Sequence, residues 1–244
     1  MPPNRRSITI LGVRIDDVTE DEAIGTLATF LAEARPHHVV TVNPEFVMEA
    51  QANPTFRMAL AQADLATPDG FGLLIAARWQ GTPLRGRVTG VELTLRLAEF
   101  AARWGYRLFL LGAAPGVAET TAAVLQQRCP GLIIAGCFAG SPHPRHEPFL
   151  GQLITHARPD ILLVAYGHPA QDLWIARNQP NLQVPIAIGV GGVFDYLSGR
   201  VPRAPQWLRR LGMEWAYRLY YQPQRWRRII NAVPRFLWAI LRQQ

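Results

Sequence analysis

The sequence predicts an α/β fold: a mostly parallel, Rossmann-like sheet with helices on both faces. The main observation is that short aliphatic and β-branched runs alternate with segments of helical periodicity from residue 107 to residue 190. Strands that alternate with helices form parallel sheets covered on both sides. Glycine and proline punctuate the junctions, and the 244 residues, 49% hydrophobic and 18% charged, are enough for a folded core.

Each predicted element has a local signal. Thr19 and Glu22 stand three residues apart, as in a capping box, where the first helix should begin. A β-branched run before Asn43 is typical of a buried strand. In chain order we predict a strand or hairpin over 7–15, a helix over 21–34, a strand over 37–42, helices over 45–52, 54–62, 71–79 and 91–104, and then strands over 107–111, 132–137, 161–165 and 184–190 separated by helices over 117–128, 147–157 and 170–178.

Residues 203–244 differ in composition from residues 1–202, which we assign to the α/β core. The tail holds nine arginines, one acid (Glu214) and four of the seven tryptophans, and its net charge of +8 leaves −1 of the formal +7 for the core. We predict that it forms a basic, amphipathic helical appendage that completes the active site and contacts a membrane surface. The alternative is a helix packed on its own domain or in an oligomer. The expected apolar face carries Trp226, Ile229, Ile230, Val233, Leu237, Ile240 and Leu241.

Composition excludes several kinds of chemistry. All 25 basic residues are arginine, which excludes a Walker-type phosphate lysine and a lysine Schiff base. Cys129 and Cys137 have neither a metal nor a disulfide spacing, and His143 and His146 lie in a proline-rich loop without a cysteine partner. We therefore expect no metal and no cofactor. No run of about 18 apolar residues is long enough to span a membrane.

Polar and glycine residues follow the predicted strands. Because the carboxyl ends of parallel strands meet at one edge, where ligands bind, these residues are candidates for a site. Glycine before a helix lets backbone amides approach a phosphate, so a diphosphate-bearing nucleotide is the expected ligand. The glycines around Gly191 can equally be a packing turn, and residues 112–116 lack the G-x-G-x-x-G spacing of dinucleotide folds. The candidates are Thr41, Asn43, Asp69, Gly112, Pro115, Gly116, Tyr166, Gln171, Gly191 and Asp195.

Asp69 is the strongest of these candidates. It lies between Pro68 and Gly70, after an apolar segment and before a predicted helix. Proline and glycine favour a sharp turn, which would hold the carboxylate at a loop tip. A catalytic carboxylate would be placed in this way, although an aspartate in a turn also commonly caps the following helix.

Several stretches together resemble one known family, the WecG/TagA/CpsF bacterial glycosyltransferases. The stretches are T-V-N-P-E-F from 41, A-D-L-A-T-P-D-G-F-G from 63, R-V-T-G from 87, L-G-A-A-P-G-V-A-E from 111, G-H-P-A-Q-D-L-W-I from 167, I-G-V-G-G-V-F-D from 188 and G-R-V-P-R-A-P from 199, followed in the tail by M-E-W-A-Y-R-L and P-Q-R-W-R-R. They cover nearly the whole chain in order. One departure is P-A-Q-D from Pro169, where the family commonly has P-K-Q-E, so Ala170 and Asp172 leave any role of that lysine in doubt.

The resemblance implies an inverting, metal-independent transfer of an N-acetylmannosamine-like sugar from a UDP-sugar to an undecaprenyl-diphosphate-linked sugar. It implies a cytoplasmic enzyme at the inner face of the membrane, with a role in cell-envelope polysaccharide or teichoic acid assembly. The sequence does not determine the oligomeric state, and a homo-oligomer stays open. The carried-over roles are Asp69 as general base, Arg87, Thr41 and Asn43 in the catalytic group, Gln171 on the donor, Asp195 at the nucleotide end, and Arg203, Arg218, Arg225 and Arg228 on the substrate, the last three closing over the diphosphate.

Two other functions stay open at this point. An arginine- and aromatic-rich tail is also compatible with nucleic-acid binding, although that would leave the polar strand ends unused. A nicotinamide-dependent oxidoreductase on a doubly wound sheet is disfavoured by the absence of G-x-G-x-x-G. The sequence does not determine which sugar is transferred.

Overall fold

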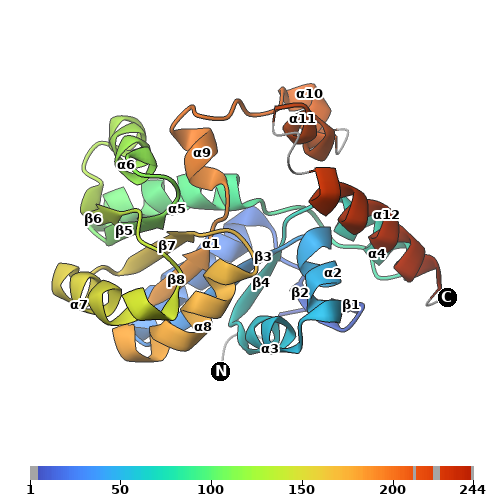
Figure 1. Cartoon of the computed structure of the whole chain (residues 1–244), viewed down its shortest axis with the longest axis horizontal. Helices are drawn as coiled ribbons and strands as arrows, with labels where there is room; N and C mark the ends of the chain where they lie inside the picture. The colour runs from blue at the N-terminus through green and yellow to red at the C-terminus, as the bar shows by residue number, and fades with distance from the viewer. Residues whose placement is uncertain (1–4, 211–212, 222–225, 243–244) are drawn as a thin grey trace.

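A computed structural model describes residues 5–210, 213–221 and 226–242 of the chain. Its centre is a six-stranded parallel sheet in the order β4-β3-β8-β7-β5-β6 (Figure 1). The strands are β3 (His37–Val42), β4 (Leu65–Pro68), β5 (Arg107–Gly112), β6 (Ile133–Phe138), β7 (Ile161–Ala165) and β8 (Ile186–Gly189). The predicted α/β fold with a parallel sheet is confirmed.

Helices cover both faces of this sheet, as the alternating side chains of a strand require. Val39 of β3 packs in the core under one layer of helices, and its neighbour Val40 packs under the other. The first layer holds α1 (Glu20–Glu33), α5 (Gly90–Trp104), α6 (Val117–Arg128) and α9 (Val193–Leu197). The second holds α2 (Pro44–Ala52), α3 (Pro54–Gln62), α7 (Glu147–Ala157) and α8 (Ala170–Leu182), with α4 (Phe71–Trp79) packed beside α2 and β1.

The N-terminal segment is a hairpin of β1 (Ser7–Ile10) and β2 (Val13–Asp16). Leu11 and Gly12 both have positive φ, at 48° and 77°, as a tight two-residue hairpin turn demands. The hairpin is tied to the sheet by the buried Asp16 carboxylate, which accepts a hydrogen bond from the Ala66 N–H at 2.9 Å. The capping box of Thr19 and Glu22 is present at the start of α1, as predicted.

Three local predictions need correction. Helix α8 does not end at Asn178 but continues past Pro180 to Leu182, because buried Leu182 and Gln179 hold its last turn against the core. Helix α9 and a short 3-10 turn over Pro144–His146 were not predicted. Both are about one turn long, too short to show a hydrophobic period.

The tail forms α10 (Gln206–Arg210), α11 (Glu214–Tyr221) and α12 (Trp226–Arg242). Figure 1 shows α12 beside α2 and α4, at the end of the molecule away from β6. Phe236 and Ile240 are fully buried there, whereas Trp226 and Leu241 are about half exposed. Of the predicted apolar face, Ile240 and Leu237 pack on the core, while Trp226 and Leu241 do not, and buried Phe236 was not predicted. The side chains of Ile229, Ile230 and Val233 lie outside the described residues. Helix α12 packs on its own chain, and the division at residue 203, with a membrane-contacting appendage, stays a prediction.

Candidate active site

A cavity of about 400 Å³ lies at the carboxyl ends of β3, β4 and β8. The first turns of α2, α4 and α5 form part of its wall, and α11 and α12 of the tail close another side. Three residues of the predicted catalytic group, Asn43, Asp69 and Arg87, come together here. Other lining side chains are Glu45, Phe71, Tyr196, Glu214, Trp215 and Phe236.

Asp69 occupies a sharp turn between β4 and α4. Its N–H donates to the Val42 carbonyl at 2.7 Å, which fixes the turn to the neighbouring strand. Gly70 has a φ of 147°, and a Cβ at this position would lie 2.9 Å from Cδ of Pro44. Only glycine fits without a shift of the backbone, so the prediction that proline and glycine hold Asp69 at a loop tip is confirmed.

The Asp69 carboxylate does not cap the helix that follows it. The N-cap of α4 is Gly70, without a side-chain hydrogen bond. Instead Asp69 Oδ2 accepts from the N–H of Gly90, the first residue of α5, at 3.1 Å. Burial raises the pKa of Asp69 to about 6, against the opposing effects of this hydrogen bond and of the Arg87 charge. A carboxylate with this pKa can exchange a proton near neutral pH.

Thr41 and Asn43 lie next to Asp69, each with a structural hydrogen bond. The buried Thr41 hydroxyl donates to the Gly189 carbonyl at 3.3 Å. A Cβ placed on Gly90 would be 3.7 Å from Thr41 Oγ1 and 3.8 Å from Asp69 Oδ2, so the two side chains share one corner. Asn43 Oδ1 accepts from the Phe46 N–H at 3.1 Å and caps α2, which leaves its amide nitrogen as the group that a ligand would contact.

Arg87 enters the cavity from the loop before α5. Its Nη1 lies 3.9 Å from Oε2 of Glu214, and both side chains are about one-fifth exposed. Glu214 begins α11, so this ion pair joins the core to the tail within the cavity. Glu214 is not among the residues predicted from the sequence, although it is marked there as the single acid among the nine arginines of residues 203–244.

Gln171 lies beneath the loops rather than in the cavity wall. It is 1% exposed, and its Oε1 accepts from the N–H groups of Gly167 at 3.1 Å and Gly191 at 2.9 Å. Gln171 thereby links the loop after β7 to the loop after β8. The Gly191 N–H, which was a candidate to contact a phosphate, donates to Gln171 instead. The neighbouring Asp172 is fully buried, with its Oδ1 3.7 Å from His38 Nε2, and burial raises its pKa. The departure from P-K-Q-E at Asp172 therefore lies in the interior of the protein.

We expect Gln171→Ala to lower the free energy of unfolding by about 1–3 kcal/mol, because two partly buried backbone donors lose their acceptor. Urea unfolding of the full chain measures this change. The exposed Gln152 is the matched control, and Gln152→Ala should change the free energy by less than about 0.5 kcal/mol. Equal losses of unfolding free energy in the two variants would contradict the role of Gln171 in linking the two loops.

The residues at the end of β5 do not line this cavity. Gly112 has a φ of 106° and packs tightly on Ala165, since a Cβ there would be 2.8 Å from the Ala165 carbonyl carbon. Pro115 and Gly116 lead into α6, where Gly116 is the N-cap. The Tyr166 hydroxyl, after β7, is buried without a hydrogen-bond partner, and burial raises its pKa. Their substrate-binding role stays a prediction.

The remaining predicted residues lie in the tail (residues 203–244) or in α9, shortly before it. Asp195 lies in α9, outside the cavity lining, where its carbonyl accepts from the Val201 N–H at 3.0 Å. Arg203 pairs with Glu92 of α5, which also accepts from Arg209 at 3.2 Å. Arg225 lies outside the described residues, as do the side chains of Arg218 and Arg228, so their predicted closure over a diphosphate is not described.

Glu45 and His168 form a further pair that sequence reasoning missed. Glu45 lines the cavity from the first turn of α2, and its Oε2 lies 3.4 Å from His168 Nε2. The His168 ring packs on Phe46 with centroids 4.9 Å apart. No local pattern marks this pair, because its two residues are more than a hundred positions apart in the sequence.

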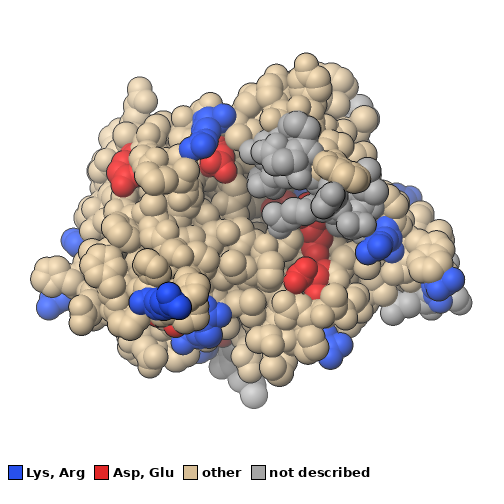
Figure 2. Space-filling model, in the orientation of Figure 1, with Lys and Arg blue, Asp and Glu red and all other residues tan. Residues whose placement is uncertain are grey.

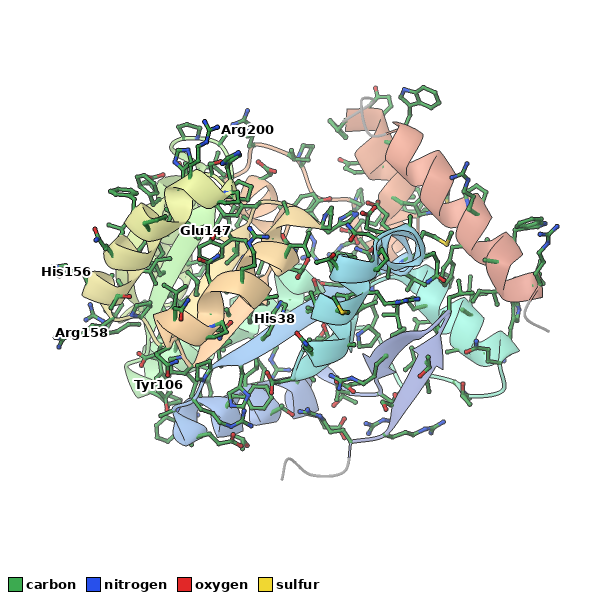
Figure 3. The ribbon with its side chains drawn as sticks, turned by 60° about the horizontal axis from the view of Figure 1, so that its bottom comes forward. His38, Tyr106, Glu147, His156, Arg158 and Arg200 are labelled. Atoms are coloured by element: carbon green, nitrogen blue, oxygen red, sulfur yellow. The ribbon has the colours of Figure 1, made fainter. Side chains whose placement is uncertain are left out.

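Other surfaces offer fewer features of a site. Figure 2 shows acidic side chains gathered over α2 in the middle of one face, with arginines spread around it. A broad, open groove runs between α7 and α8, where Figure 3 labels Glu147, His156 and Arg158, on the side of the molecule away from α12. None of the predicted site residues lines it.

The residues that the structure describes contain neither a group of metal-ligating side chains nor a helix that could span a membrane. Within them no three His, Cys, Asp or Glu side chains are grouped so as to hold a metal ion. Across the same ranges, no helix has the length and apolar character needed to cross a bilayer.

The fold and the cavity define an α/β enzyme with an ionisable carboxylate at the carboxyl edge of its sheet. Residues 8–244 match the glycosyl transferase WecG/TagA/CpsF family, and the chain belongs to that family. It is therefore a glycosyltransferase, and the match leaves nucleic-acid binding and nicotinamide-dependent oxidation without support.

Named relatives have the same class of activity. The chain is 35% identical to the N-acetylglucosaminyldiphosphoundecaprenol N-acetyl-beta-D-mannosaminyltransferase of Bacillus spizizenii, over 88% of this chain and 83% of the relative. It is 32% identical to the protein of that name from Bacillus subtilis, over 84% of this chain and 79% of the relative. The relative of that name from Staphylococcus aureus is 29% identical, over 97% of this chain and 93% of the relative.

Proposed function

We propose that this enzyme transfers an N-acetylmannosamine-like sugar, with inversion, from a UDP-sugar to a sugar linked to undecaprenyl diphosphate. The observation that carries the proposal is the Asp69 carboxylate, with a pKa raised to about 6, in a 400 Å³ cavity at the sheet edge. The names of the relatives support the acceptor and the sugar.

In the proposed reaction Asp69 accepts the proton of the acceptor hydroxyl. The hydroxyl oxygen forms a bond to the anomeric carbon from the face opposite the nucleotide, and the carbon–oxygen bond to UDP breaks with its electron pair. UDP leaves as an anion, and the configuration at the anomeric carbon is inverted. A positioned carboxylate base contributes typically about 10²- to 10⁴-fold to such a step.

The leaving diphosphate needs positive charge, which we assign to arginine. Arg87 lines the cavity and has a planar fork suited to phosphate oxygens. Arg218, Arg225 and Arg228 are proposed to add to it from the tail. Arg203, which pairs with Glu92, is proposed to contact the substrate as well. Thr41 and Asn43 are proposed to orient the sugar beside Asp69. Asp195 is proposed to contact the nucleotide.

The environment of the enzyme is part of the proposal. An undecaprenyl acceptor is held in a membrane, so the enzyme would work on its cytoplasmic surface. Trp207, Tyr220 and Trp238 of the tail helices are each more than half exposed, which suits an interfacial contact. A homo-oligomer is compatible with this arrangement, and the product would enter cell-envelope polysaccharide or teichoic acid assembly.

The test is a transfer assay with full-length protein, a panel of UDP-sugars and a short lipid-diphosphate sugar acceptor. The panel should include N-acetylmannosamine, its uronic acid and glucose-type donors, and the Asp69→Asn variant serves as the matched control. A single productive UDP-sugar names the donor. Absence of turnover with every donor would contradict the proposal.

We expect a chelator to leave the rate unchanged, because the proposed charge stabilisation comes from arginine and backbone amides rather than from a metal ion. The measurement compares initial rates with EDTA and with added magnesium or manganese. A strict requirement for a divalent ion would overturn the metal-free mechanism.

A further inference from the structure

The charges that line the cavity are unbalanced. Among the described side chains that line it, three are carboxylates (Glu45, Asp69 and Glu214) and one is an arginine, Arg87. Carboxylates that share one cation compete for it, and the closer partner keeps it. The position of Arg87 therefore decides how Asp69 is paired, and with what strength it can act as a base.

Arg87 is held by the tail and not by the base. Its Nη1 lies 3.9 Å from Glu214 Oε2, whereas no ion pair joins it to Asp69. A separation of 3.9 Å is an ion pair without a direct hydrogen bond. A diphosphate, which offers the guanidinium two oxygens in bidentate geometry, can displace such a partner.

The geometry points to Glu214 as a positioning residue: we propose that it holds Arg87 on the tail side of the cavity, away from Asp69, and releases it to the substrate diphosphate. This inference rests on the proposed function, in which Asp69 is the base. It adds a role for the tail beyond supplying arginines, since the docking of α11 then sets the strength of the base.

The groups that face Asp69 come from four elements. The Gly90 N–H and Glu92 belong to α5, Arg87 to the preceding loop, Glu214 to α11, and Glu45 lines the same cavity from α2. The charges of Glu214 and Glu92 raise the pKa of Asp69, and the charge of Arg87 lowers it. Glu92 also accepts from Arg203 and Arg209, so the tail is fixed to the same helix that holds Asp69.

Loss of the Glu214 charge should therefore strengthen the pairing of Arg87 with Asp69. In Glu214→Gln we expect the pKa of Asp69 to fall by about 0.5–1 unit, because one repelling charge is lost and the attracting charge is free to approach. The acid limb of kcat/KM should move to lower pH by the same amount. Because the base is weaker, kcat should fall about three- to ten-fold.

The experiment is a carbon NMR titration of the Asp69 carboxyl in the full-length protein, assigned with Asp69→Asn, together with pH profiles of kcat/KM. Glu214→Asp keeps the charge and should restore most of the wild-type pKa. Glu45→Gln removes a carboxylate from the same cavity and should leave the Asp69 pKa in place; an equal shift in this control would overturn the specific role of Glu214.

A double-mutant cycle tests the route through Arg87. In an Arg87→Gln background, Glu214→Gln should shift the pKa of Asp69 by less than half as much as in the wild type. A full shift there would show a direct charge effect and overturn the positioning role, as would no shift in the single variant. The titration needs no turnover, so a shifted pKa in a protein that transfers no sugar would contradict the proposed function alone.

Discussion

Asp69→Asn is expected to lower kcat by about two to four orders of magnitude while donor binding changes little. Asparagine has nearly the same shape and can still accept from the Gly90 N–H, but it cannot take the proton of the acceptor hydroxyl. Turnover in the transfer assay and UDP binding by calorimetry measure the two effects separately. Loss of UDP binding with the loss of turnover would remove Asp69 from the role of base.

The wild-type pH dependence follows from the same residue. Asp69 must be ionised to accept a proton, and burial raises its pKa to about 6. The kcat/KM of the wild type should therefore rise with pH and level off above a midpoint near 6, and this limb should be missing from the residual activity of Asp69→Asn. A limb near the ordinary aspartate pKa of 3.8 would contradict the raised value.

As the pH rises, the free energy of unfolding should fall while kcat/KM rises. An acid whose pKa is higher in the folded chain binds more protons when folded, so the free energy of unfolding falls as pH rises from 3.8 to about 6. Above that range the wild type carries a penalty of at most about 3 kcal/mol, reduced by the contact of Asp69 with solvent in the cavity. Asp69→Asn should remove this penalty at pH 7, and unfolding in urea at pH 4 and pH 7 tests the difference.

Much of the sheet could be predicted from the sequence, because buried parallel strands consist of short continuous aliphatic runs that can be recognised locally. The strands over His37–Val42 and Ile161–Ala165 were predicted with exact bounds. The turn at Asp69 was also predicted, since proline and glycine restrict the backbone through local sterics. These features depend on neighbours in the chain and on nothing further away.

The composition of the cavity could not be predicted in the same way. The strand order places β8 and β7 between β3 and β5, so at about 4.8 Å per strand the end of β5 is roughly 14 Å from that of β3. Gly112 and Asp69 each follow a strand predicted from the sequence, yet only Asp69 lines the cavity. Likewise, the pairing of Glu214 with Arg87 depends on how the tail folds back, which no local pattern contains.

Phe236→Ala is expected to lower the free energy of unfolding by about 3–5 kcal/mol. Phe236 is fully buried in the core that α12 shares with α2, α4 and the N-terminal hairpin. A Cβ placed on Gly72 of α4 would lie 3.6 Å from the Phe236 ring, which shows how closely the ring sits on that helix. Truncation of a buried phenylalanine loses the transfer energy of the ring and leaves a cavity. Urea unfolding of the full chain measures the loss.

Trp238 provides the matched control on the same helix. It is 54% exposed and stacks with Arg242, whose guanidinium carbon is 3.4 Å from the ring centroid, so Trp238→Ala should cost less than about 1 kcal/mol. Phe236 also lines the cavity, and its removal should lower turnover because α12 no longer closes that wall. If Phe236→Ala kept both the stability and the turnover of the wild type, α12 would not be docked in solution, and it would not form a wall of the cavity.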